Sequence, residues 1–185
     1  HGHYDHGGGL PAFLAASAGA ARPAPVYARA GAFAEHASGS PAAHHTIGLD
    51  PALEEIPRVQ ALGEGPVEIA PGLTLFTTQR RDHPAADSNR HLLELRAGAW
   101  VPDAFGHEQS LLVEEGGRRI LVAGCAHAGI LNIMDEAERL AGSPLDAVVA
   151  GFHLMSPSAG QAQAAEATRA LGRELAARSA TRYYT

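Results

Sequence analysis

Short apolar runs separated by glycine, proline and polar residues dominate the first half of the chain. Residues 1–10 are rich in glycine and predict a loop, and the alanine-rich stretch after them predicts a short helix over 11–18. A brief apolar run predicts a buried strand over 26–28. Residues 37–66 contain several prolines and glycines in polar surroundings, and we expect a long irregular excursion there.

The second half alternates between strand-like and helix-like patterns. Strands are predicted over 67–78 (two, around a Pro-Gly turn), 91–96, 110–114, 118–123, 147–152 and from Tyr183 onward. A helix is predicted over 130–141, ending at Gly142, and another from an N-cap at Ser158 to about 178. This order predicts a mixed α+β fold, and 185 residues suit one domain over 1–185.

Charge and hydropathy narrow the possible partners. The net charge of -6 argues against nucleic acid, since phosphate binding needs a basic surface. No apolar run is long enough to span a bilayer and no secretory signal opens the chain, so we expect a cytoplasmic protein without a membrane partner. We therefore expect a small-molecule substrate. The oligomeric state does not follow from the sequence.

The counts of lysine, cysteine and histidine narrow the possible chemistry further. All 14 basic residues are arginine, which excludes a Schiff-base lysine and a P-loop lysine. Cys125 is the only cysteine, so there is no disulfide framework, and a reducing compartment is the natural interpretation. The 11 histidines are numerous for this length, and their positions suggest metal chemistry.

The first six residues, HGHYDH, carry the sharpest signal. His1 and His3 are two positions apart, so an extended backbone presents both imidazoles on one side, within reach of one metal ion. Asp5 and His6 follow and can reach an adjacent second ion. This ligand set suits one or two zinc ions, and manganese or iron are possible alternatives. Two other interpretations stay open: a purification tag or solvated terminus, and a terminal copper or nickel chelate.

Four motifs in order resemble the metallo-β-lactamase superfamily. They are HGHYDH with the following glycines, DAFGHEQSL at 103–111, GCAHAGI at 124–130 and GFHL at 151–154. They look most similar to the branch described as dihydropterinyl-methyl-ribofuranosyl-aminobenzene phosphate synthases or metal-dependent hydrolases. The resemblance implies an αβ/βα sandwich, here expected to be truncated at both ends, because the strands before His1 and a later ligand turn are absent from the sequence.

The resemblance also implies further site residues. His127 follows a strand and is expected to be a metal ligand together with His1, His3, Asp5 and His6. Cys125 and His153 are further ligand candidates. Their alternatives are a small buried thiol and a satisfied core histidine.

Other residues near these motifs receive lesser roles. Asp103, His107 and Glu108 could orient a ligand histidine. The branch has a His-Pro pair where this chain has Arg29 and Ala30. The remaining histidines lie in polar contexts and are predicted to be exposed; they are His36, His44, His45, His83 and His91.

The function implied is that of a metal-dependent hydrolase in which a metal-bound hydroxide attacks an ester, phosphoester or related bond, with Asp5 as the catalytic residue. A transferase that joins a pterin to a ribofuranosyl-aminobenzene phosphate is an alternative. Its anionic substrate could be bound by Arg80, Arg81 and Arg90, which could equally form a solvated face. A non-catalytic remnant of the fold is a third possibility.

Overall fold

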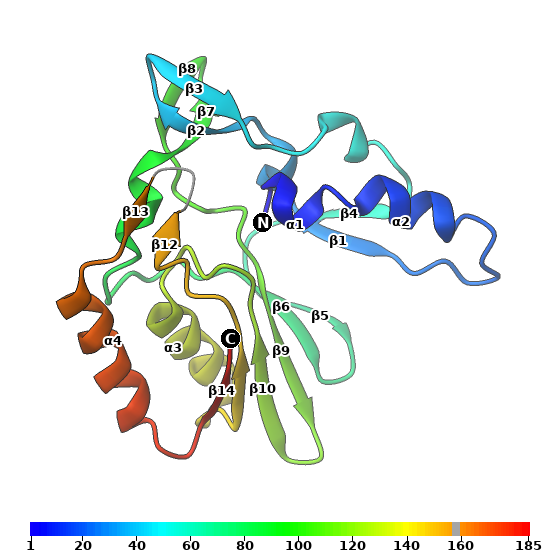
Figure 1. Cartoon of the computed structure of the whole chain (residues 1–185). Helices are drawn as coiled ribbons and strands as arrows, with labels where there is room; N and C mark the ends of the chain where they lie inside the picture. The colour runs from blue at the N-terminus through cyan, green and yellow to red at the C-terminus, as the bar shows by residue number, and fades with distance from the viewer. Residues whose placement is uncertain (157–159) are drawn as a thin grey trace. The chain divides into compact units, whose positions relative to one another are not determined.

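The computed structural model describes residues 1–156 and 160–185, and the chain forms two compact units (Figure 1). The first unit consists of His1–Glu64 and His91–His107, and the second of Gly65–Arg90 and Glu108–Thr185. Each unit contains both helices and sheets, so the predicted mixed α+β class is confirmed.

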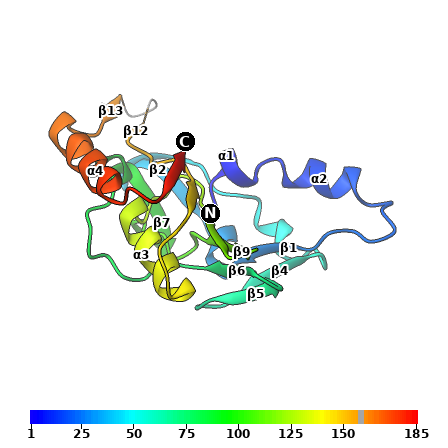
Figure 2. The same cartoon turned by 90° about the horizontal axis from the view of Figure 1, so that it is seen from below.

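The first unit opens with two short helices, α1 (Tyr4–Gly7) and α2 (Leu10–Ala16), so the expected glycine-rich loop contains a helical turn. The strands β1 (Val26–Arg29) and β4 (Val59–Leu62) pair in parallel. Leu10 and Leu14 of α2 pack against a buried cluster that includes Phe33 and Val59. In Figure 2, α1 and α2 follow the same side of the β1–β4 pair.

An antiparallel sheet of the first unit has the order β3-β2-β7-β8. Its strands are β2 (His36–Ser40), β3 (Ala43–Thr46), β7 (Leu92–Arg96) and β8 (Ala99–Pro102). The expectation of an irregular excursion over 37–66 is therefore wrong, because β2 and β3 form a hairpin in which Ser40 pairs with Ala43. Every residue of β3 is exposed, so no apolar alternation marks it in the sequence.

Single turns of 3-10 helix connect several of these strands. They are η1 (Ala30–Phe33), η2 (Pro51–Leu53) and η3 (Asp87–His91).

The second unit is built on a six-stranded sheet with the order β14-β11-β10-β9-β6-β5. Its strands are β5 (Val67–Ala70), β6 (Leu73–Phe76), β9 (Ser110–Glu115), β10 (Arg118–Val122), β11 (Ala147–Val149) and β14 (Arg182–Tyr184). Neighbouring strands among β5, β6, β9 and β10 are antiparallel, and β10, β11 and β14 are parallel to one another. A short pair, β12 (Met155–Ser156) with β13 (Gln161–Ala162), lies outside this sheet.

Two helices, α3 (Ile130–Ala141) and α4 (Ala165–Ala177), connect the parallel strands and lie on one side of this sheet (Figure 1). Leu121, Val148 and Tyr183 are register partners that belong to the core with residues of both helices. The next partners along the same strands are Val122, Val149 and Tyr184, which are 39%, 43% and 54% exposed. One face of this sheet therefore forms the core and the opposite face keeps a row of apolar side chains in solvent.

The helix predictions differ in outcome. The structure confirms α3 over 130–141 and its end at Gly142, which adopts the left-handed conformation of a helix C-cap. The predicted N-cap Ser158 lies outside the described residues, and α4 begins at Ala165. None of the described helices has the length and hydropathy of a membrane-spanning segment.

Candidate metal centre

The N-terminal histidines of the first unit lie close together. The ring centroids of His1 and His3 are 4.6 Å apart, and those of His1 and His6 are 4.0 Å apart. His3 forms a β-bridge with Gly48, and α1 begins at the next residue, which turns His6 back toward the first two rings. Three imidazoles of the HGHYDH segment therefore lie close together within one unit.

Gly2 separates His1 from His3, and its backbone approaches η1 too closely for any other residue. A Cβ atom at this position would lie 2.2 Å from the carbonyl oxygen of Ala32. The Gly2 N–H also donates to Nδ1 of His107 at 2.9 Å. Both contacts fix the backbone between the two histidines.

Asp5 has a more open environment. Its side chain is 56% exposed, and Oδ2 lies 3.7 Å from Nε2 of His6. Burial, the largest influence, lowers the pKa of His6 below its ordinary value, although the Asp5 carboxylate opposes this shift. Among the described residues, Asp5 is outside the close groups of possible ligand atoms, and its role as a ligand stays a prediction.

Beneath this loop, Asp103 joins three histidines in a buried cluster of the first unit. Its Oδ2 lies 3.1 Å from Nδ1 of His36, 3.1 Å from Nε2 of His107 and 3.8 Å from Nε2 of His3. Burial by itself would raise the pKa of the Asp103 carboxyl, but the contacts with His107, His3 and His36 hold it well below its ordinary range. Asp103 is therefore ionised and acts as the hydrogen-bond acceptor of the cluster.

Hydrogen bonds determine the proton positions on two of these rings. His107 accepts the Gly2 N–H at Nδ1, so its proton is on Nε2, where it is donated to Asp103. A metal on Nε2 would require that proton to leave, so His107 is a supporting group and not a ligand in this arrangement. Burial lowers the pKa of His107, in agreement with a neutral ring.

His36 is charged in the same arrangement. Nδ1 faces Asp103, and Nε2 lies 3.0 Å from the carbonyl oxygen of Gly31, so both ring nitrogens face acceptors. Burial lowers the pKa of His36, but the hydrogen bonds to Asp103 and Gly31 outweigh it and raise the pKa overall. The prediction that His36 is exposed is wrong: it is 1% exposed, because Asp103 supplies a buried counter-charge.

In the second unit, Cys125, His127 and His153 bring one ligand atom each within 4.8 Å of one another. The loop after β10 carries Cys125 and His127, and the segment after β11 carries His153. The ring centroids of His127 and His153 are 4.2 Å apart. The three candidates that follow parallel strands therefore meet in space, as the ends of neighbouring parallel strands do.

Asn89 determines the tautomer of His127. The Asn89 Nδ2 group donates to the His127 carbonyl oxygen at 2.8 Å, so the amide oxygen is the atom that faces Nδ1 of the ring at 2.8 Å. Nδ1 must then carry the proton and Nε2 the lone pair. Proteins orient metal-binding histidines by this kind of outer hydrogen bond.

Glu108 fixes the backbone of the same loop. Its two carboxylate oxygens accept the N–H groups of His127 and Ala128, each at 2.7 Å. Burial raises the pKa of Glu108 despite these two hydrogen bonds. The prediction that Glu108 helps to orient a ligand histidine agrees with this geometry.

His153 has an unusual backbone conformation. Its φ of 46° lies in the left-handed region, which costs energy for a residue other than glycine. The Ser88 hydroxyl donates to its carbonyl oxygen, which holds this conformation in place. A strained residue held by a specific contact is typical of a functional position, although the strain by itself assigns no role.

The two sets of candidate ligands belong to different units. His1, His3, Asp5 and His6 lie in the first unit, and Cys125, His127 and His153 lie in the second. Within each unit the histidines of the set are gathered. Their convergence on one common centre stays a prediction.

The arginines are engaged within the protein. Arg80 pairs with Asp82 at 2.8 Å and Arg90 with Asp87 at 3.6 Å, and both arginines are largely exposed. Arg81 donates to the Thr78 carbonyl oxygen. Arg29, in the position of the His-Pro pair, is 2% exposed and donates to the Gly63 carbonyl oxygen, and burial lowers its pKa.

Comparison with known proteins supports the fold. No protein-family profile and no curated protein matches the chain. The structure is similar to the crystal structure of a metal-dependent hydrolase of the beta-lactamase superfamily, with a TM-score of 0.67 and 26% sequence identity over 84% of this chain. The chain spans 56% of the length of that protein. The predicted metallo-β-lactamase-like fold class is thereby confirmed.

Proposed function

We propose that this chain carries the metal ligands of a hydrolase that acts on an ester, phosphoester or related bond of a small-molecule substrate. The observation that carries the proposal is the tautomer of His127. Asn89 fixes the ring proton on Nδ1, so the lone pair is on Nε2. Cys125 and His153 offer further ligand atoms close to this ring. Metal-binding histidines usually donate their other ring N–H to an outer partner of this kind. The similarity to a metal-dependent hydrolase supports the same conclusion.

The donor atoms fit zinc best. A thiolate and two imidazoles in one group, with three more imidazoles in the N-terminal loop, match the ligands that zinc prefers. The soft sulfur donor of Cys125 disfavours manganese, which prefers carboxylate and water ligands. When bound, the zinc ion would supply a Lewis acid that lowers the pKa of a coordinated water to about 7.

The residues of the chain have separate roles in this proposal. In the second unit, His127, His153 and Cys125 would be metal ligands. In the first unit, His1 and His3 would be metal ligands. Asp5 is exposed and adjacent to His6, so its carboxylate can hold a water molecule and accept its proton during attack on the substrate.

Asp103 and His107 act at a greater distance. His107 accepts the Gly2 N–H, and Asp103 accepts the Nε2 proton of His107. Together they would keep His1 and His3 in one orientation before any metal binds.

A finer assignment follows from the motif resemblance. The synthase branch acts on a pterin and a ribofuranosyl-aminobenzene phosphate, which makes a transferase the second candidate. An anionic substrate of that kind would have to displace Asp82 and Asp87 from Arg80 and Arg90. Exposed ion pairs contribute only about 0–1 kcal/mol, so breaking these two pairs costs little free energy. The transferase therefore stays a second candidate. A non-catalytic remnant of the fold is the third candidate.

A zinc-binding series tests the proposal. Cys125→Ser, His127→Ala and His153→Ala should each weaken zinc binding, measured by competition with a chromophoric chelator, and each should abolish hydrolysis of nitrophenyl acetate or bis-nitrophenyl phosphate. His45→Ala is the matched control, because His45 is exposed on β3. Unchanged zinc affinity in all three variants would exclude the metal centre. Normal zinc binding without turnover of either ester would favour the transferase or the remnant.

A further inference from the structure

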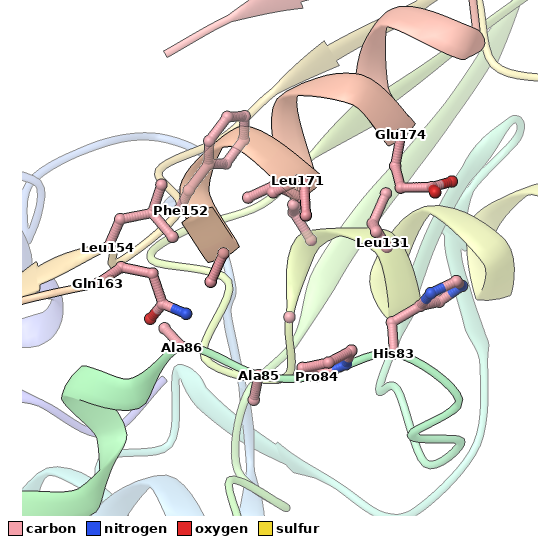
Figure 3. A pocket seen from close by; sticks show the side chains of 14 residues that line it. His83, Pro84, Ala85, Ala86, Leu131, Phe152, Leu154, Gln163, Leu171 and Glu174 are labelled. Carbon is pink, nitrogen blue, oxygen red and sulfur yellow. The ribbon is translucent and has the colours of Figure 1, made fainter. Parts of the chain in front are cut away.

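The second unit contains a cavity of about 320 Å³ between the N-terminal end of α3 and the helix α4 (Figure 3). All of its lining residues belong to this unit. None of the candidate metal ligands lines it, although Phe152 and Leu154, the chain neighbours of His153, do. The cavity therefore lies next to a candidate ligand without including it. Its volume lies at the lower end of the range, about 300–1,000 Å³, in which proteins bind small molecules.

Small apolar side chains leave this space open. Ala85 and Ala86 form one wall, and Ala167 and Ala170 of α4 belong to another. Larger apolar residues complete the lining, and they are Ile130, Leu131, Phe152, Leu154 and Leu171. The helix α4 has no fully buried residue, although its apolar stripe faces the core. The cavity therefore offers an apolar surface that the chain itself does not fill.

Two of the polar side chains that line the cavity, Gln163 and Glu174, lie at different ends of it in Figure 3. Gln163 lies beside Leu154 at one end, and its Oε1 accepts the N–H of Asp87 at 2.8 Å, so the remaining amide group is a donor. Glu174, an exposed residue, extends from α4 at the other end. A few polar groups in an apolar cavity give a bound molecule its orientation.

Glu174 gives the cavity a negative end. Within the described part of the chain, no ion pair involves Glu174, and the adjacent arginines of the same helix region bind other carboxylates: Arg173 pairs with Glu166, and Arg178 with Asp135. None of the described residues that line the cavity is an arginine. A cationic group on a ligand would therefore meet an available carboxylate, and an anionic group would meet repulsion.

We propose that this cavity is a binding site for a small molecule with an apolar body and one cationic end, such as an aryl-alkyl amine. The apolar body would pack between Phe152, Leu154 and Leu171, and the cation would lie beside Glu174. Binding at this site does not depend on the metal centre, so it is independent of the hydrolase proposal.

Three matched probes test the site: phenylbutylamine, phenylbutanol and phenylbutyrate, which share one apolar body and differ in charge. Each is titrated into the ¹⁵N-labelled full chain after removal of metal by chelation, and amide shifts are followed. We expect saturable shifts at cavity residues, with the amine bound roughly two- to fivefold more tightly than the alcohol, the advantage of an exposed ion pair. The acid should bind more weakly than the alcohol.

Three variants complete the test. Ala170→Trp should fill the cavity and abolish binding of all three probes, whereas Ala176→Trp, on an exposed position of the same helix, should not. Glu174→Gln should remove the preference for the amine and leave alcohol binding unchanged. If Ala170→Trp fails to fold, the Glu174→Gln comparison decides the question. The proposal is overturned if no probe shifts the cavity amides, if Ala170→Trp binds normally, or if the acid binds as tightly as the amine.

Discussion

Asn89 holds His127 at two atoms, since its amide oxygen faces Nδ1 at 2.8 Å and its amide nitrogen donates to the carbonyl oxygen at 2.8 Å. The two contacts fix both the orientation and the tautomer of the ring before any metal binds. Preorganisation of this kind lowers the entropy that a ligand loses on binding.

Replacing Asn89 by Ala should weaken zinc binding by about 10- to 100-fold, the usual cost of losing an outer hydrogen bond to a ligand histidine. Asn89→Asp is the matched comparison, because it keeps an acceptor for Nδ1 and should retain most of the affinity. Chelator competition measures both variants. Equal zinc affinity in Asn89→Ala and the unchanged protein would show that His127 does not bind the metal through Nε2.

Replacing His107 by Phe should destabilise the first unit. The change keeps an aromatic ring but leaves the Gly2 N–H without its acceptor and removes one of the donors to Asp103, and each loss costs about 1–3 kcal/mol. Urea unfolding followed by circular dichroism measures the difference. His45→Phe is the control at an exposed position and should change stability by no more than about 0.5 kcal/mol. Similar midpoints for the two variants would contradict the proposed network.

The charge on His36 predicts a pH dependence of stability. Its pKa is raised in the folded state above 6.5, so its contribution is present below this value and is lost as the pH rises through the folded pKa. The metal-free protein should therefore have a higher free energy of unfolding than the His36→Gln variant. This difference should be larger at about pH 6 than at about pH 9. A constant difference across this range would mean that His36 is neutral in the folded protein.

Asp5→Ala tests catalysis separately from folding. The exposed carboxylate contributes little to packing, so the free energy of unfolding should change by no more than about 0.5 kcal/mol while turnover is largely lost. Glu55→Ala, another exposed carboxylate of the first unit, should keep full activity. Wild-type turnover in Asp5→Ala with metal bound would rule out the catalytic role of Asp5.

Sequence patterns predict the second unit better than the first. The helix α3 has a regular apolar stripe and a glycine at its end, and the β9–β10 hairpin has apolar arms around two glycines, so local chemistry is sufficient for both. The strand β3 is exposed on every residue, and its pairing with β2 leaves no trace in the hydropathy. The irregular loop predicted there followed from its prolines and glycines alone.

The candidate site shows the same limit. The spacing of His1 and His3 predicts that they act together, because both belong to one short segment. The burial of His36 depends on Asp103, which lies 67 positions further along the chain, and no local pattern contains that information. Asn89 is likewise a polar residue in a turn, and only its distance to His127 reveals its role.

The row of Val122, Val149 and Tyr184 has a consequence for the handling of the protein. These side chains are adjacent on neighbouring strands, so they form one exposed apolar patch on the second unit, which favours association with other molecules. The residues that stabilise the sheet, Leu121 and Val148, lie on its opposite face. Solubility and folding stability are thus controlled by different faces of the same strands. Threonine in place of Val122 or Val149 keeps the β-branched shape and would reduce aggregation through this face without weakening the core.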